Sequence, residues 1–243
     1  MVPSKGSTSH ASAFLAAILG AEAAMTPYQK IFIGNTMYYN FHTHHQPQDS
    51  TETAILNCYP EDILPASSPC SIGLHPWHVD NDWQEKVNMV RSKAQADNVW
   101  AIGECGLDKV RGGDLSTQIQ AFSAQLQIAR ELHKPVIVHC VKAYDELLHA
   151  ITNDDHIIIH GFRGKWQQAK QIIAKGALLS FGNQYNLETL RFVYSSNTPF
   201  FLETDDLRLS VRQIYEQVGH HLDVDVSHLV RLCDPRQICG RLP

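Results

Sequence analysis

The feature that most constrains the fold is a series of short apolar runs, rich in β-branched and aromatic residues, that recur from Met37 onward. Runs of this length and composition are typical of buried β-strands. Eight of them lie at residues 37–43, 54–59, 70–74, 99–104, 135–139, 156–160, 177–181 and 199–204. A chain of 243 residues can bury all of these strands in one substantial core, so we predict one folded domain.

From the third run onward, the connections are long enough to hold helices. Between the fourth and fifth runs, apolar residues recur at the helical period: Leu115, Ile119, Phe122, Leu126 and Ala129. Asp114 is a suitable N-cap for this helix, and Pro135 prevents it from continuing beyond Lys134. Alternating strands and helices imply parallel pairing, so eight such units predict a TIM (β/α)8 barrel, with the second unit shortened to a loop around residues 60–69.

Residues 1–36 precede this pattern, and we expect them to form an N-terminal extension outside a barrel domain of residues 37–243. The apolar run at residues 13–24 is too short to span a bilayer. Glu22 interrupts it, which favours an appended leader over a secretory signal peptide.

The six cysteines form no CxxC pair, so we expect reduced thiols in a cytoplasmic protein with no membrane partner.

Six polar side chains stand at or just after the carboxyl ends of the predicted strands: His42, His44, Glu104, His139, His160 and Asp205. In a TIM barrel, these ends converge on one face, where such enzymes build their active sites. Residues spread over more than half of the chain would therefore meet in one place. A lone HxH pair could be two hydrogen-bonded strand histidines, but the convergence of all six favours a functional site.

Imidazole and carboxylate groups are ligands that suit Zn, Mn, Fe or Mg ions. Six such ligands are more than one tetrahedral metal site can use. They fit two divalent cations that share a carboxylate and lie roughly 3.5–4 Å apart. Such a pair lowers the pKa of a bound water, so the sequence predicts hydrolysis without a protein nucleophile. Read alone, Asp205 could cap a helix beginning near Leu207, but Asp206 is the better cap.

The net charge of −5 and the pI near 6.2 argue against a broad nucleic-acid-binding face, which would need many Lys and Arg residues. A small group of basic residues at the opening of the predicted active site is compatible with this net charge. Lys142 and Arg163 follow predicted strands and could contact a phosphate, and His75 could touch substrate. The alternatives are loop packing of His75 beside Trp77 and an ordinary left-handed turn around Arg163.

Six motifs, in this order, resemble the signatures of the TatD family of metal-dependent deoxyribonucleases. They are NFHTHHQ, GLHPWHV, GECGLD, KPVIVHC, IIIHGFRG and FLETDD, and they run from about Met37 to Asp206. The resemblance implies a TIM barrel that hydrolyses DNA phosphodiester bonds, often from the 3' end.

The same resemblance implies roles for the six polar residues. His42, His44, Glu104 and Asp205 would hold one metal, and a bridging Glu104 would hold the second with His139 and His160. Asp205 and Glu104 would be the catalytic carboxylates, and the cofactors would be two divalent ions such as Mg, Mn or Zn.

The chain departs from the family pattern at two places. Asn40 stands where the family usually has aspartate, two residues before His42 and on the same expected strand face. An amide supports a metal ligand less well than a carboxylate does. Cys140 and Val141 replace the usual Ser-Arg after the fifth strand, so Lys142 or Arg163 would have to supply the phosphate contact.

Three functions follow from these patterns. The first is a two-metal phosphodiesterase acting on single-stranded DNA as a 3'-5' exonuclease. The second is an amidohydrolase-like enzyme acting on a small ester or amide, which many such barrels support with a modified lysine where this chain has Glu104. The third is an inactive barrel that only binds metal or a partner. The complete ligand set favours the first, and no long apolar stripe predicts a subunit interface.

Overall fold

The computed structural model describes residues 37–48 and 50–237, and it contains one eight-stranded parallel sheet in which each strand pairs with the next along the chain. The strands are β1 (Tyr38–Thr43), β2 (Glu52–Cys58), β3 (Cys70–Ile72), β4 (Val99–Asp108), β5 (Val136–Val141), β6 (Ile157–Ile159), β7 (Leu178–Phe181) and β8 (Phe200–Leu202). All eight predicted strands are therefore present, and the prediction of a TIM-type barrel is confirmed.

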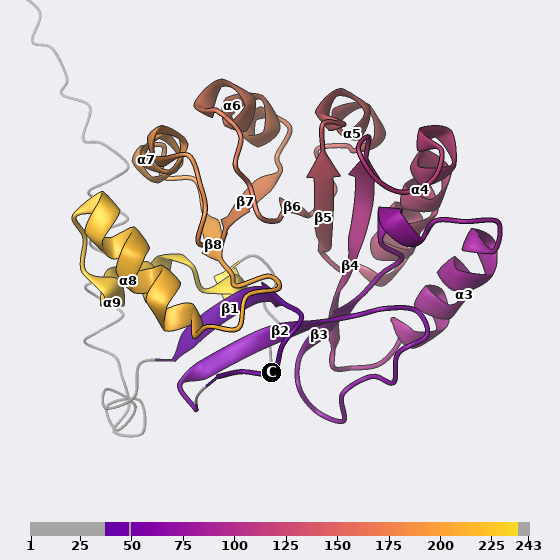
Figure 1. Cartoon of the computed structure of the whole chain (residues 1–243), viewed down its shortest axis with the longest axis horizontal. Coiled ribbons are helices and arrows are strands. Elements are labelled where there is room, and N and C mark those ends of the chain that lie inside the picture. The colour runs from indigo at the N-terminus through magenta and orange to yellow at the C-terminus, as the bar shows by residue number, and fades with distance from the viewer. Residues whose placement is uncertain (1–36, 49, 238–243) are drawn as a thin grey trace, which may run out of the picture. The chain divides into compact units, whose positions relative to one another are not determined.

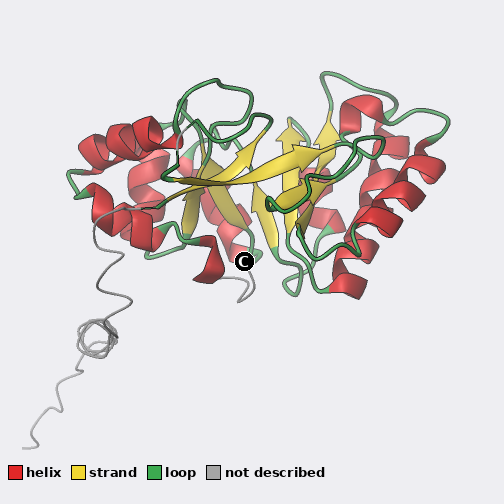
Figure 2. Cartoon of the chain, turned by 90° about the horizontal axis from the view of Figure 1, so that it is seen from below, coloured by secondary structure: helices red, strands yellow, loops and turns green. Residues whose placement is uncertain are grey.

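Helices lie in an arc outside the strands (Figures 1 and 2). They are α3 (Trp83–Lys93), α4 (Leu115–Leu132), α5 (Tyr144–Ala150), α6 (Trp166–Ala174), α7 (Leu187–Ser195), α8 (Val211–Leu222) and α9 (Val226–Leu232), with 3-10 turns η2 (Pro76–His78) and η3 (Pro235–Gln237). Asp114 caps α4 as predicted, because its carboxylate accepts from the amides of Ser116 and Thr117. The β2–β3 connection holds no helix among its described residues, as expected.

The helix after Asp205 differs from the prediction. It begins at Val211, where the Ser210 hydroxyl accepts from the Arg212 amide, and not near Leu207. Asp206 therefore caps no helix start. The segment between β8 and α8 is instead an irregular loop at the mouth of the barrel.

The barrel closes where β8 returns to β1. The backbone amide of Asp205 donates to the carbonyl of His42, and the amide of His44 donates to the carbonyl of Asp205, each at 3.0 Å. These two hydrogen bonds form an isolated parallel bridge between Thr43 and Asp205. The sheet is thus joined at the same level as three of the predicted metal ligands.

Two strands contain an extra residue. In β1, Asn40 pairs with Ala54 and Thr43 with Leu56, so β1 advances one residue more than β2. Such a bulge changes the face to which the following side chains point. The Asn40 amide therefore donates to Glu52 Oε1 (2.7 Å) and Thr204 Oγ1 (2.8 Å). It ties β1 to its neighbours, and neither of these contacts is with one of the six predicted ligands.

The second irregular strand is β4. Ile102 pairs with Val136 and Cys105 with Val138, which again leaves an extra residue, at Gly103 or Glu104. Gly103 has a φ of +141°, and a Cβ there would collide with the carbonyl of Ile137. Only glycine fits this position, so the glycine inside the strand marks the bulge that directs Glu104 into the site. The strand continues to Asp108, so Glu104 does not end it as predicted.

Two apolar layers hold the barrel. A large layer lies between the sheet and the helices, and a smaller cluster fills the barrel itself. In the smaller cluster, the rings of Phe41 and Phe201 stack at 4.3 Å, and Trp100 meets Phe41 edge-on at 5.6 Å. Ile137 and Ile158 also belong to it, each two residues before a predicted histidine ligand. The floor of the site is therefore a packed apolar plug.

The prediction of an N-terminal extension concerns residues that lie outside the described part, so it stays a prediction. Five of the cysteines, Cys58, Cys70, Cys105, Cys140 and Cys233, carry free thiols, in agreement with the expectation, and Cys239 lies outside the described residues. Within residues 37–48 and 50–237, no helix has both the length and the apolar composition needed to cross a bilayer.

Phe201→Ala is expected to lower the free energy of unfolding by about 3–5 kcal/mol, because it removes a fully buried ring and leaves a cavity in the plug. Urea unfolding followed by circular dichroism measures this change. The matched control is Ile63→Ala, at a side chain that is 95% exposed, which should change stability by less than about 0.5 kcal/mol. Equal, small effects of the two substitutions would contradict the packed plug.

Candidate metal centre

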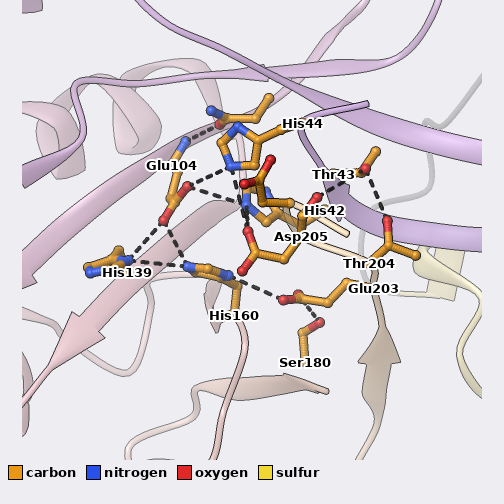
Figure 3. Close-up of polar contacts among 12 residues, drawn as sticks. His42, Thr43, His44, Glu104, His139, His160, Ser180, Glu203, Thr204 and Asp205 are labelled. Carbon is orange, nitrogen blue, oxygen red and sulfur yellow. Dashed lines mark hydrogen bonds and ion pairs between the residues drawn. The ribbon is translucent and has the colours of Figure 1, made fainter. Parts of the chain in front are cut away.

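The six predicted side chains meet at the carboxyl ends of the strands (Figure 3). Glu104 lies at their centre and is buried, with 4% of its side chain exposed. Its Oε2 faces His42 and His44, and its Oε1 faces His139 and His160. One carboxylate therefore contacts two separate groups of imidazoles, as a carboxylate that bridges two metals would.

The first group consists of His42, His44, Glu104 and Asp205. The Nε2 atoms of His42 and His44 lie 3.3 and 3.4 Å from Glu104 Oε2, and 3.7 and 3.6 Å from Asp205 Oδ1. Four ligands at about 2.0–2.1 Å from a tetrahedral metal are separated from one another by roughly 3.3 Å. These atoms are thus close to the spacing that such a metal requires.

His42 provides an independent test of this fit. Its side chain is fully buried, and neither ring nitrogen has a hydrogen-bond partner among the described residues. A buried, unpaired polar atom is costly unless something satisfies it. A cation between Nε2 and the two carboxylates would satisfy it, so the donor set fits a bound metal.

The second group is His139, His160 and Glu104. His139 Nδ1 and His160 Nε2 lie 2.9 and 2.8 Å from Glu104 Oε1, and 3.5 Å from each other. The other ring nitrogen of each histidine meets a carboxylate. His139 Nε2 lies 3.2 Å from Asp108 Oδ2, and His160 Nδ1 lies 3.2 Å from Glu203 Oε1.

Carboxylates in these positions orient metal-binding histidines, because they fix the ring proton on the far nitrogen and leave the near one free for a metal. Glu203 is held in turn by the hydroxyl of Ser180, which donates to its Oε2 (Figure 3). We did not predict Asp108 or Glu203 as site residues from the sequence. Both lie in recognisable motifs, GECGLD and FLETDD, but their role depends on which ring nitrogen they face.

The electrostatics of the cluster follow from this crowding. Burial raises the pKa of Glu104, but the imidazoles around it, His160 first, lower it by more, so the pKa lies well below the usual value. Burial lowers the pKa of His160, but Glu104 and Glu203 raise it well above the usual value. The pKa of His44 is also raised, because Glu104 outweighs the effect of burial. Without metal, His160 and His44 therefore retain their protons to a higher pH than an ordinary histidine does.

His75 lies closer to the centre than we predicted for a substrate-binding residue. Its Nε2 is 3.1 Å from Glu104 Oε1, and with Glu104 and His139 it forms a group that could hold a metal. Its Nδ1, however, accepts from the amide of Trp77 at 3.1 Å, which leaves the ring proton on Nε2. Burial lowers the pKa of His75 and keeps the ring neutral. We therefore assign His75 as a hydrogen-bond donor to Glu104.

A cavity of about 260 Å³ opens above the ligands, and Tyr59 and Trp77 line it. A second cavity of about 290 Å³ adjoins it at Asp205 and Asp206, and Arg163 lines this one, with a hydrogen bond of 2.9 Å to Gln184. Lys142 is exposed and lines neither cavity. Of the two predicted phosphate-binding residues, only Arg163 thus lies beside the site.

Metal binding should stabilise the protein. Adding Zn²⁺ or Mn²⁺ at about 100 times its dissociation constant is expected to raise Tm by ~5–10 °C, since binding contributes about 2.7 kcal/mol. The metal must displace protons from His160 and His44, whose pKa values are raised, so the gain should be larger at pH 8 than at pH 6. Differential scanning calorimetry measures both effects.

Glu104→Gln should lose most of this stabilisation, because the amide cannot bridge two cations. His149→Gln, at an exposed histidine on α5, is the matched control and should retain it. An equal gain in Tm for Glu104→Gln and the wild type would show that the cation binds elsewhere.

Asp108→Asn tests the orienting carboxylate. The amide keeps the shape of the side chain but cannot accept the proton of His139 Nε2 through its nitrogen, so metal affinity at the second group should fall about 10- to 100-fold. Isothermal titration of metal into the variant and into Asp145→Asn, an exposed aspartate on α5, measures the difference. Unchanged affinity in Asp108→Asn would mean that His139 does not need this partner.

Comparisons with known proteins identify similar sequences and similar folds. The chain is similar to the 3'-5' ssDNA/RNA exonuclease TatD of Erwinia billingiae, with 36% identity over 115 residues, which cover 45% of this chain and 43% of that protein. It is also similar to the exonuclease of the same name from a Pantoea species, with 46% identity over 74 residues, or 30% of this chain and 28% of that one. The matches thus span less than half the length of these relatives.

Solved structures share the fold. A TatD homologue from Escherichia coli K12 superposes with a TM-score of 0.63 at 18% identity, over 81% of this chain and 94% of its own. A TatD-family hydrolase from Entamoeba histolytica gives a TM-score of 0.65 at 13% identity, over 86% of this chain and 99% of its own. The profile of TatD related DNases matches residues 42–213, which begin at the first predicted ligand and end inside α8. The chain therefore belongs to the TatD related DNase family.

Proposed function

We propose that this protein is a two-metal phosphodiesterase that removes nucleotides from the 3' end of single-stranded DNA. The observation that carries this proposal is the position of Glu104, whose two oxygens face two different sets of nitrogen ligands. The similarity to proteins named as 3'-5' ssDNA/RNA exonucleases supports a nucleic-acid substrate. We propose Zn, Mn or Mg as the ions, because histidine with carboxylate accepts each of them.

The proposed ligands are His42, His44, Glu104 and Asp205 for one ion, and Glu104, His139 and His160 for the other. Two such ions would supply a water of lowered pKa and positive charge next to the phosphoryl oxygens. The chain itself supplies the proton acceptor. Asp205 is 39% exposed in the cavity, whereas Glu104 is 4% exposed, so Asp205 can orient the water and accept its proton.

His75 has a different role in this proposal. Its Nε2–H donates to Glu104 Oε1 and holds the carboxylate in the orientation that faces both groups. Asp108 and Glu203 fix the rings of His139 and His160 in the same way. The cytoplasmic location that we predicted and the role of residues 1–36 as an extension stay predictions.

The test is hydrolysis of a single-stranded DNA oligonucleotide labelled at its 5' end. Metal-loaded wild type should shorten it stepwise from the 3' end, and EDTA should stop the reaction. Glu104→Ala should lose at least about 100-fold in kcat/KM, since even residues that only orient metal ligands cost 10- to 100-fold. Glu85→Ala, at an exposed glutamate in the first turn of α3, is the control and should keep full activity.

Two outcomes would contradict the proposal and favour the other functions. Cleavage of bis(p-nitrophenyl) phosphate or a simple ester, with DNA left intact, would support an enzyme for small substrates. Stoichiometric metal binding with no hydrolysis of any of these compounds would support an inactive barrel.

A further inference from the structure

The rim of the candidate metal centre carries an arginine stacked on a tryptophan. The guanidinium carbon of Arg111 lies 3.6 Å from the centre of the Trp77 ring. Trp77 is 37% exposed and lines the cavity above the metal ligands. Its Nε1–H donates to Asp108 Oδ2 at 2.6 Å, and the same oxygen lies 3.2 Å from His139. The stack is thus connected to the ligand set by direct contacts.

The loop after β4 is built to hold this arginine in place. The carboxylate of Asp108 accepts from the backbone amide of Arg111 at 3.0 Å, which closes the start of the loop. Gly112 has a φ of +100°, and a Cβ there would come within 2.5 Å of the carbonyl of Pro76. The loop therefore packs directly on the turn that carries Trp77, at a distance that a side chain at residue 112 would prevent.

Arg111 also has unused hydrogen-bond donors. Stacking uses the flat face of a guanidinium and leaves the N–H groups at its edge free to bind an anion. The side chain is exposed, and its guanidinium meets no hydrogen-bond acceptor within residues 37–48 and 50–237. Two other cations near the mouth are engaged. Lys109 forms an ion pair with Glu146 at 2.7 Å, and Arg163 donates to Gln184.

The negative charge of the acidic residues around the cavity favours a cation at the rim, because these residues would repel the phosphates of a bound strand. Glu104, Asp205 and Asp206 line it, and bound divalent ions would offset this negative charge only for the phosphate in direct contact with them. Every further nucleotide brings another phosphate toward an acidic rim. A fixed arginine on this rim would reduce the repulsion and hold the strand in register.

We propose that Arg111, held on Trp77, binds the backbone phosphate next to the one that is cleaved. This inference rests on the proposed function, because it assumes a polynucleotide substrate. Arg111 is a substrate-binding residue in this proposal, and within the described part of the chain it contacts Trp77 through its side chain and Asp108 through its backbone amide. Trp77 acts by stacking, since it fixes the plane of the guanidinium and links it to Asp108.

The test compares a substrate with several phosphates to one with a single phosphate. Arg111→Gln should lower kcat/KM for a single-stranded DNA oligonucleotide by about 10- to 100-fold, mainly through KM. The slope of log(kcat/KM) against log[salt] should become shallower by about 0.7, the value expected when one phosphate contact is lost from a single strand. Hydrolysis of bis(p-nitrophenyl) phosphate, which has no second phosphate, should stay at the wild-type level.

Two further variants sharpen the comparison. Arg111→Lys should recover part of the loss, because it keeps the charge but stacks less well and cannot bind in the bidentate mode. Arg91→Gln, at a partly exposed arginine in the last turn of α3, is the control and should behave as wild type on both substrates.

Several results would overturn the inference. Equal losses on both substrates would mean that Arg111 supports the metal centre or the fold, and an unchanged oligonucleotide rate would mean that it binds no phosphate. If wild type does not cleave the oligonucleotide, fluorescence anisotropy with the intact strand separates the two proposals. Binding that weakens in Arg111→Gln, with the shallower salt slope, would keep the phosphate contact and reject only the nuclease; absence of binding would reject both.

Discussion

Two backbone hydrogen bonds at Asp205 determine both the barrel and the site. They join β8 to β1 at His42 and His44, so the contact that closes the sheet also sets the distance between ligands from its first and last strands. Asp205 adopts a left-handed conformation there, with a φ of +52°. Non-glycine residues rarely adopt this conformation unless the surrounding structure enforces it. The contact that closes the barrel therefore also places Asp205 beside the two histidines of β1.

Much of this arrangement could be predicted from the sequence. The strands could be predicted because buried parallel strands appear in a sequence as short apolar runs. The shared site could be predicted because polar residues stand at the carboxyl ends of these runs, and those ends meet on one face of a barrel. The prediction failed where it assumed strict alternation of side chains. Asn40 was expected beside His42, but the extra residue in β1 moves it toward Glu52 and Thr204. A bulge depends on the pairing between two strands, so the sequence of one strand does not reveal it. In β4, the glycine at position 103 inside the strand was a signal from which its bulge could have been predicted.

The residues that the sequence did not identify share one property. Asp108 and Glu203 face the far nitrogens of His139 and His160. His75 was predicted from the sequence as a substrate contact, but its contact with Glu104 was not. Each role depends on the orientation of a ring, which follows from three-dimensional contacts and not from residue type. The proposed metal ligands could be selected from the sequence because histidine and carboxylate side chains are unusual at strand ends. Their supporting residues are ordinary polar groups until the ring nitrogen that they face is known.

The contacts that run from Trp77 through Asp108 to His139 have a thermodynamic consequence. One oxygen, Asp108 Oδ2, accepts from the indole and also meets the imidazole, so any shift of the indole changes the free energy of that imidazole's orientation. An anion that binds Arg111 and a cation that binds His139 therefore act on the same oxygen from opposite sides. Linkage requires such effects to be reciprocal. If the proposed strand and cation both bind, any factor by which the cation changes the affinity for the strand would equal the factor by which the strand changes the affinity for the cation.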